Sequence, residues 1–174
     1  FIKRAFKETL GVDIVTPMQR MTYNEAMNRY GSDKPDTRYG MEIIDISEAV
    51  KHSEFVVFKS ALEMGGSVRG IVAKGAAATL TRKEIDKLTE HAKGIGAKGL
   101  AYVRWVDEKP TCSFAKFMAE GELEAILERI GCEKGDVALI VADKARVTLP
   151  VLGALRLTMA KRLDIIPEGY DFLW

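Results

Sequence analysis

The sequence is poor in the residues that build metal centres and disulfide frameworks. It has two cysteines and two histidines in 174 residues, and the spacing of Cys112 and Cys132 matches no metal-binding motif. We expect free thiols, the state that a reducing compartment favours, with a disulfide between the two cysteines as the alternative. No metal site is predicted.

A dominant charge and long apolar runs are also lacking. Lysine plus arginine (26) nearly balances aspartate plus glutamate (25), which leaves a formal net charge of +1. No long-range field therefore indicates a polyanionic partner, and any contact with a nucleic acid must come from a local patch. No apolar run approaches the length that spans a bilayer, so we predict no membrane partner. The proportions of hydrophobic (47%) and charged (29%) residues are those of an ordinary globular domain.

Familiar catalytic motifs are missing as well. The sequence contains no phosphate-binding loop, dinucleotide fingerprint or nucleophile elbow. The glycines at 65, 66 and 70 lack the spacing and the following helix of a phosphate cradle. The residue pattern therefore predicts neither a catalytic residue nor a cofactor-binding residue.

The stretch from Leu80 to Val106 has the clearest local pattern. Thr81 is a favourable N-cap, and Glu84, three residues later, is placed to complete a capping box. Apolar residues then recur at helical spacing on one face: Ile85, Leu88, Ala92 and Ile95. Glycines end this helix, and the alternating residues from 100 to 106 predict a strand. Such a unit needs a sheet on which to pack.

Other segments supply that sheet. Residues 55–58, 68–73 and 137–142 predict three more strands, and the last is continuously apolar, which favours a central position. Helices are predicted over residues 122–130 and over a long segment that ends near residue 163. We therefore predict an α+β fold of two layers, with a mostly antiparallel four-stranded sheet covered by helices.

The long helix near the end of the chain has an uncertain start. Because Pro150 lacks an amide donor, the helix is expected to begin either at Thr148 or near Lys144 with a kink at the proline. It is basic, and we expect its charges to lie mostly on a solvated face: Arg146, Arg156, Lys161 and Arg162.

The first forty residues predict two helices and a polar loop. Residues 2–10 have helical periodicity, and Thr22 with Glu25 forms a capping box ahead of a short helix over residues 23–30. The loop from 30 to 40 gathers charged and hydroxyl side chains around a proline: Ser32, Asp33, Lys34, Asp36 and Arg38. Its composition favours a surface turn, and the alternative is a loop that holds a charged substrate.

Two stretches resemble a known family. RMTYNEAMNRYGSDKPDTRYG, residues 20–40, is similar to bacterial-type aspartyl-tRNA synthetase in the core segment ahead of its insertion. LTRKEIDKLTEHAKGIGAKGLAYVRW, residues 80–105, resembles the centre of that insertion, the GAD domain. SFAKF (113–117), GALRL (153–157) and YDFLW (170–174) fit the same pattern, so the resemblance covers essentially the whole chain.

This resemblance implies three parts. Residues 1–40 would flank the class II catalytic core, residues 41–165 would form the GAD insertion with an RNA-polymerase-subunit-like fold, and residues 166–174 would return to the core. The chain, which begins at Phe1 and ends at Trp174, is expected to be a piece of a longer protein. It lacks the arginine-bearing motifs 2 and 3 and the anticodon-binding OB-fold, so we expect no enzyme activity from it alone.

The resemblance also implies partners. The parent enzyme would be a cytoplasmic homodimer that uses ATP and Mg²⁺ to attach aspartate to tRNA, and this piece would bind no cofactor. Contact with the tRNA acceptor arm is the leading expectation, through Arg82, Lys83, Lys87 and Lys98. The loop residues nearest the parent active site would be Ser32, Asp33 and Lys34. A protein-interaction module, or the equivalent domain of a Glu-tRNA amidotransferase subunit, is the alternative.

Overall fold

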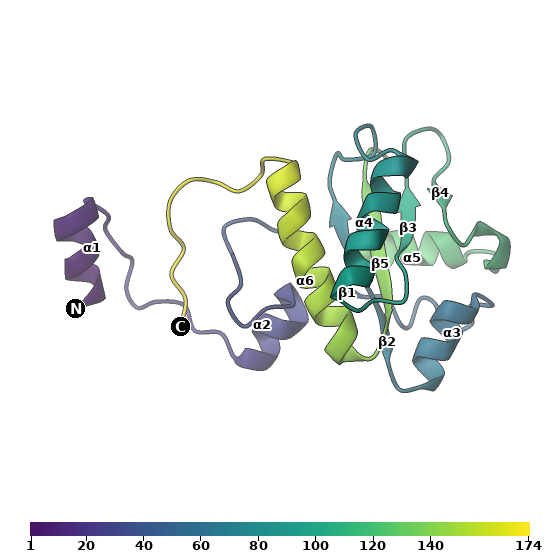
Figure 1. The fold of residues 1–174 in the computed structure, drawn as a ribbon, viewed down its shortest axis with the longest axis horizontal. Coiled ribbons are helices and arrows are strands. Elements are labelled where there is room, and N and C mark those ends of the chain that lie inside the picture. Colours follow the sequence, from purple (N-terminus) through teal and green to yellow (C-terminus); the bar gives the residue numbers. More distant parts are fainter.

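The computed structural model describes residues 1–174 and is elongated, with α1 at one end and the sheet at the other (Figure 1). Helices and strands follow in the order α1 (Ile2–Leu10), α2 (Tyr23–Tyr30), β1 (Ile44–Asp45), α3 (Val56–Glu63), β2 (Ser67–Ala73), α4 (Arg82–Ile95), β3 (Ala101–Arg104), β4 (Thr111–Cys112), the 3-10 turn η1 (Ala115–Phe117), α5 (Glu122–Ile130), β5 (Val137–Asp143) and α6 (Ala145–Arg162).

The sheet is antiparallel throughout, with the strand order β1-β2-β5-β3-β4. Strand β5 lies in the middle, as its continuous apolar sequence predicts. Seven residues of β5 pair with β2, from Ser67 opposite Asp143 to Ala73 opposite Val137. The α+β class and the antiparallel sheet are thus confirmed, with five strands rather than four.

Helices pack on both faces of this sheet, so the molecule has three layers where two were expected. One core joins α4 and α6 to alternate residues of β5, namely Val137, Leu139 and Val141. The other joins α3 and α5 to the residues between them, Ala138 and Ile140. The side chains of a strand alternate between faces, and in β5 both faces are apolar because both are covered.

The segment FVVF, residues 55–58, is not the strand that its β-branched residues suggested. Phe55 is the N-cap of α3, and the helix runs on to Glu63. Phe58 is fully buried and packs edge-on against Phe114, with ring centroids 5.0 Å apart. This tertiary contact overrides the local strand propensity. Strands β1 and β4, two residues each, have no sequence pattern long enough to reveal them.

The two predicted capping boxes differ in the structure. The Thr22 hydroxyl accepts a hydrogen bond from the Glu25 amide at 3.2 Å, as predicted, but the Glu25 carboxylate pairs with Arg29 at 2.7 Å, so only half of this capping box forms. Thr81 is the N-cap of α4, but its side chain makes no capping bond. The Glu84 carboxylate instead pairs with Lys87 at 2.8 Å and Arg162 at 2.6 Å. The predicted box at Thr81 is therefore wrong, because stronger charged partners take its glutamate.

The last helix begins at the earlier of its two predicted starts. Lys144 is the N-cap of α6, and Pro150 lies inside the helix. The Thr148 hydroxyl donates to the Asp143 carbonyl at 3.1 Å, which links the first turn of α6 to β5. Beyond α6, the predicted return strand is reduced to one parallel bridge between Gln19 and Leu173, which lies outside the sheet.

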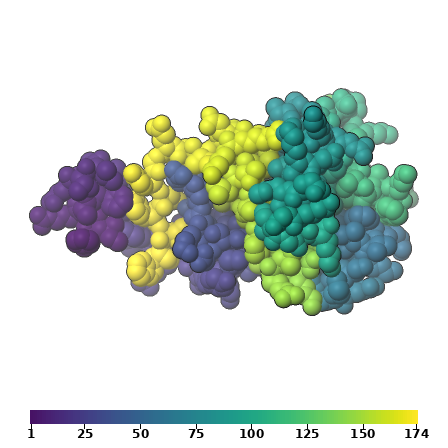
Figure 2. Space-filling view, in the orientation of Figure 1, coloured from purple at the N-terminus to yellow at the C-terminus, as the bar shows by residue number.

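The two N-terminal helices have different environments. Helix α1 has no buried residue and projects from the body of the molecule (Figure 2). Helix α2 packs against α6, and the contact is close because glycines meet there. A Cβ on Gly153 would lie 2.6 Å from the carbonyl oxygen of Gly31, closer than real contacts allow. Two helix backbones can approach this closely only where side chains are absent.

Candidate functional site

The polar loop from 31 to 40 follows α2 and begins with Gly31 in the left-handed conformation (φ 68°). The Lys34 amide donates to the Ser32 hydroxyl at 3.1 Å, which closes a tight turn. The Asp33 and Lys34 side chains are exposed and pair with each other at 3.1 Å. The structure thus brings the three predicted loop residues together at one turn.

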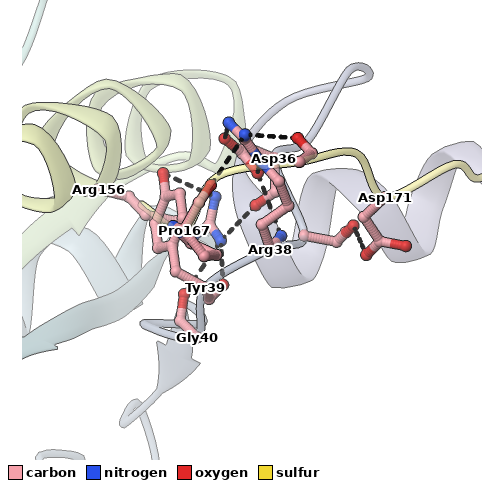
Figure 3. A network of polar contacts seen from close by, with 9 residues as sticks. Asp36, Arg38, Tyr39, Gly40, Arg156, Pro167 and Asp171 are labelled. Atoms are coloured by element: carbon pink, nitrogen blue, oxygen red, sulfur yellow. Dashed lines mark hydrogen bonds and ion pairs between the residues drawn. The ribbon is translucent and has the colours of Figure 1, made fainter. Parts of the chain in front are cut away.

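The second half of the loop is bound to the C-terminal segment. Arg38 pairs with Asp36 at 2.7 Å and donates to the carbonyls of Pro167 and Gly169 at 3.1 and 3.0 Å (Figure 3). The hydrogen bonds from Arg38 hold the pKa of the Asp36 carboxyl below its ordinary value. The loop and the segment after α6 therefore form one connected structure, although more than 120 residues separate them in sequence.

Arg156 on α6 binds the same loop. Its side chain is buried, with the residue only 3% exposed, which corrects the expectation that the charges of this helix are solvated. The guanidinium lies over the rings of Tyr30 and Tyr39, 4.7 and 4.1 Å from their centroids. Burial lowers the pKa of Arg156 from its ordinary value, but an arginine remains charged at neutral pH.

A cavity of about 610 Å³ opens between α2, the loop and the C-terminal segment. Asp33 and Lys34 line it together with Thr22, Asp171 and Trp174. Its lining combines charged and hydroxyl groups with three aromatic residues. This arrangement could hold a polar ligand by hydrogen bonds and ion pairs. No group of three His, Cys, Asp or Glu residues is placed to bind a metal ion.

The basic candidates on α4 lie at its first turns. Arg82, Lys83 and Lys87 are exposed, and only Lys87 has an acidic partner, Glu84. The first turn of α4 also presents free amide donors and the positive end of the helix dipole, both of which favour a phosphate. Arg162 at the end of α6 lies at the same end of α4 through its ion pair with Glu84, a long-range pairing that no local pattern predicts.

Lys98 does not belong to that cluster. It follows the C-terminus of α4, whose 14 residues span about 21 Å. Its ammonium lies 3.6 Å from the Asp143 carboxylate, and it borders an apolar cavity of about 220 Å³ with Phe55, Val57 and Leu100. Lys98 therefore lies at the opposite end of α4 from Arg82, and its contact with tRNA stays a prediction.

The molecule is thus a small α+β module with further segments at both ends of the chain. Helix α2, the polar loop and the C-terminal segment lie on the side of α6 that faces away from the sheet (Figure 1). The model of the GAD domain family matches residues 58–152, which is more than half of the chain. The chain belongs to the GAD domain family. No helix is long and apolar enough to cross a membrane.

Curated relatives extend the match to the flanking parts. The chain is 52% identical over 174 residues to an aspartate–tRNA(Asp/Asn) ligase of Caldanaerobacter subterraneus subsp. tengcongensis. It is 53% identical over 176 residues to an aspartate–tRNA ligase of Agathobacter rectalis, and 52% identical over 174 residues to one of Clostridium botulinum. Each match covers 99% of this chain and 29% of the relative. The chain therefore spans under a third of the length of these ligases.

Proposed function

We propose that this chain is the accessory insertion domain, with its flanks, of an aspartate–tRNA ligase. The observation that carries the proposal is the identity of about half of all positions across 99% of the chain, flanks included. A GAD module from an amidotransferase subunit would not be expected to share the loop from 31 to 40 with ligases. The parent would attach aspartate to tRNA with ATP and Mg²⁺ as a cytoplasmic homodimer.

In this proposal the flanks and the module belong to different parts of the parent enzyme. Residues 1–40 and 166–174 belong to the catalytic core, and residues 41–165 form the insertion. The chain alone neither activates aspartate nor charges tRNA, because the ATP-binding motifs of class II ligases are outside it. Aspartate-dependent pyrophosphate exchange by the purified 174-residue chain would contradict this part of the proposal.

The insertion lies beside the tRNA acceptor arm, and the N-terminal end of α4 faces it. Arg82 and Lys83 support this placement, since both are exposed cations without an acidic partner at a helix N-terminus. Glu84, Asp86 and Glu90 on the same helix weaken the local field. Binding of tRNA by the chain alone should therefore be weak and should fall further as salt rises.

A protein-interaction role is the second candidate. Val56, Val57 and Phe117 are large apolar residues with exposed fractions of 68%, 46% and 47%, and Phe117 stacks on Phe55 beside α3. Hydrogen exchange on the full-length ligase, with and without tRNA, separates the two roles. Protection of α4 amides by tRNA supports the acceptor-arm placement. Amides of α4 that tRNA leaves unprotected, with α3 and η1 already protected without tRNA, support the interaction module instead.

A further inference from the structure

We propose that Arg156 is a positioning residue, through which the last helix of the module fixes the conformation of the loop from 31 to 40. The loop carries Asp33 and Lys34 at the rim of the 610 Å³ cavity. Its backbone has no strand or helix hydrogen bonds of its own. The inference that this affects activity rests on the proposed function, whereas the inference about loop conformation does not.

The contacts of Arg156 are directed at loop backbone. Its Nη2 lies 2.7, 2.9 and 3.0 Å from the carbonyl oxygens of Asp36, Tyr39 and Gly40, and its Nη1 donates to the Tyr39 hydroxyl at 3.3 Å (Figure 3). Three carbonyls from a five-residue segment thus converge on one nitrogen. A cation that binds three carbonyls selects one backbone conformation, because each carbonyl must point inward at the same time.

Arginine suits this role better than any other residue. Its planar guanidinium can stack between two aromatic rings while its edge donates hydrogen bonds, and here it lies against Tyr30 and Tyr39. Lysine would keep the charge but lose the planar fork and most of the stacking. No carboxylate forms an ion pair with Arg156, so its buried charge is compensated by the loop carbonyls and the rings of Tyr30 and Tyr39.

The geometry also separates this role from ordinary core packing. Arg156 lies one turn beyond Gly153, where α6 and the start of the loop touch through backbone. The Nε of Arg156 has no hydrogen-bond partner, so all of its donated bonds go to the loop. Arg38 and Asp36 then extend the attachment to Pro167 and Gly169. The loop is therefore held on two sides, and Arg156 is the charged side chain that links it to α6.

The test replaces Arg156 with lysine in the 174-residue chain and measures hydrogen exchange. Within peptides that cover residues 32–40, the amides of Lys34 and Arg38, which donate to the Ser32 hydroxyl and the Asp36 carboxylate, should exchange at least about tenfold faster, which corresponds to about 1.4 kcal/mol. Peptides from β5 should keep their protection, because the sheet is not attached through this side chain. Arg146→Lys is the matched control, since Arg146 is an exposed arginine on the same helix, and it should change neither set of peptides.

A second variant approaches the contact from the loop. Tyr39→Leu removes the stacked ring and the hydroxyl but leaves α6 intact, and it should produce the same local acceleration. Unchanged exchange at residues 32–40 in both variants would overturn the proposal. So would an equal loss of protection in β5 and the loop in both variants, since Arg156 would then contribute only to global stability.

Enzyme activity is the measurement that a purely structural role of Arg156 would leave unchanged. In the full-length ligase, Arg156→Lys should lower kcat for aspartate-dependent pyrophosphate exchange about tenfold and leave the KM for tRNA unchanged. A mobile loop with full exchange activity would overturn the link between loop conformation and activity. No exchange activity in the unmodified full-length protein would overturn the proposed function instead, and the hydrogen-exchange result would still decide the role of Arg156.

Discussion

Replacing Gly153 with alanine tests the contact that joins the N-terminal flank to the module. The added Cβ would lie 2.6 Å from the Gly31 oxygen and 2.9 Å from the Tyr30 oxygen, both backbone atoms that cannot rotate away. Overpacking of this kind costs about 1–3 kcal/mol. Alanine also gains about 1 kcal/mol over glycine in a helix, so the net effect on unfolding free energy must be isolated by a control.

Gly94→Ala provides that control. Gly94 lies in α4, and a Cβ there would meet nothing within 4 Å, so this variant keeps the helix gain without the clash. Urea unfolding of both variants should show Gly94→Ala above the parent chain and Gly153→Ala below Gly94→Ala by about 1–3 kcal/mol. Equal stability of the two variants would refute the close packing of α2 on α6.

Three further predictions concern the rest of the chain. Ile85→Ala should cost about 2–5 kcal/mol of unfolding free energy because Ile85 is fully buried. Thr22→Ala should cost about 1 kcal/mol and Thr81→Ala less, since only Thr22 makes a capping bond. Thermal unfolding checks the order, and a larger cost at Thr81 than at Thr22 would contradict it. Two carboxyl groups have pKa values below their unfolded values. Arg38 lowers the pKa of Asp36. Lys74 and two backbone amides lower the pKa of Asp136 against the opposing effect of burial. The unfolded chain therefore binds more protons, and stability should be full above about pH 4 and fall as the pH drops through the folded pKa values, as acid titration by circular dichroism would show; stability that rises toward low pH would contradict the sign. Deletion of α1 should cost no more than about 3 kcal/mol of unfolding free energy, because none of its residues is buried and Phe6 packs edge-on against Tyr170 and Phe172; a larger loss in urea unfolding would contradict this.

Much of the fold could be predicted from periodicity. The bounds of α5 and the central place of β5 follow from their apolar patterns, and α2 follows from its cap at Thr22. The segment from 55 to 58 misled because four apolar residues in a row fit a strand or a helix equally well, and only the aromatic contact of Phe58 with Phe114 decides between them. The second helical layer was missed because α3 was read as a strand and the pattern of α5 does not show which face of the sheet the helix covers.

The site was less accessible to sequence reasoning. Ser32, Asp33 and Lys34 were named through the family resemblance, and their turn-forming composition agrees with the local turn that they make. Arg156 could not, since its partners in the loop lie 116 to 120 residues away and a basic helix is ordinarily solvated. Contacts of this range follow from the tertiary fold and leave no local pattern.

The most direct test of the proposed function is a double charge reversal at the start of α4 in the full-length ligase. Arg82→Glu with Lys83→Glu should raise the KM for tRNA roughly tenfold or more and leave aspartate activation without tRNA unchanged. Lys51→Glu with Lys59→Glu, two exposed lysines near α3, should change neither quantity. Unchanged charging kinetics in the α4 variant would contradict a contact between this helix and the acceptor arm.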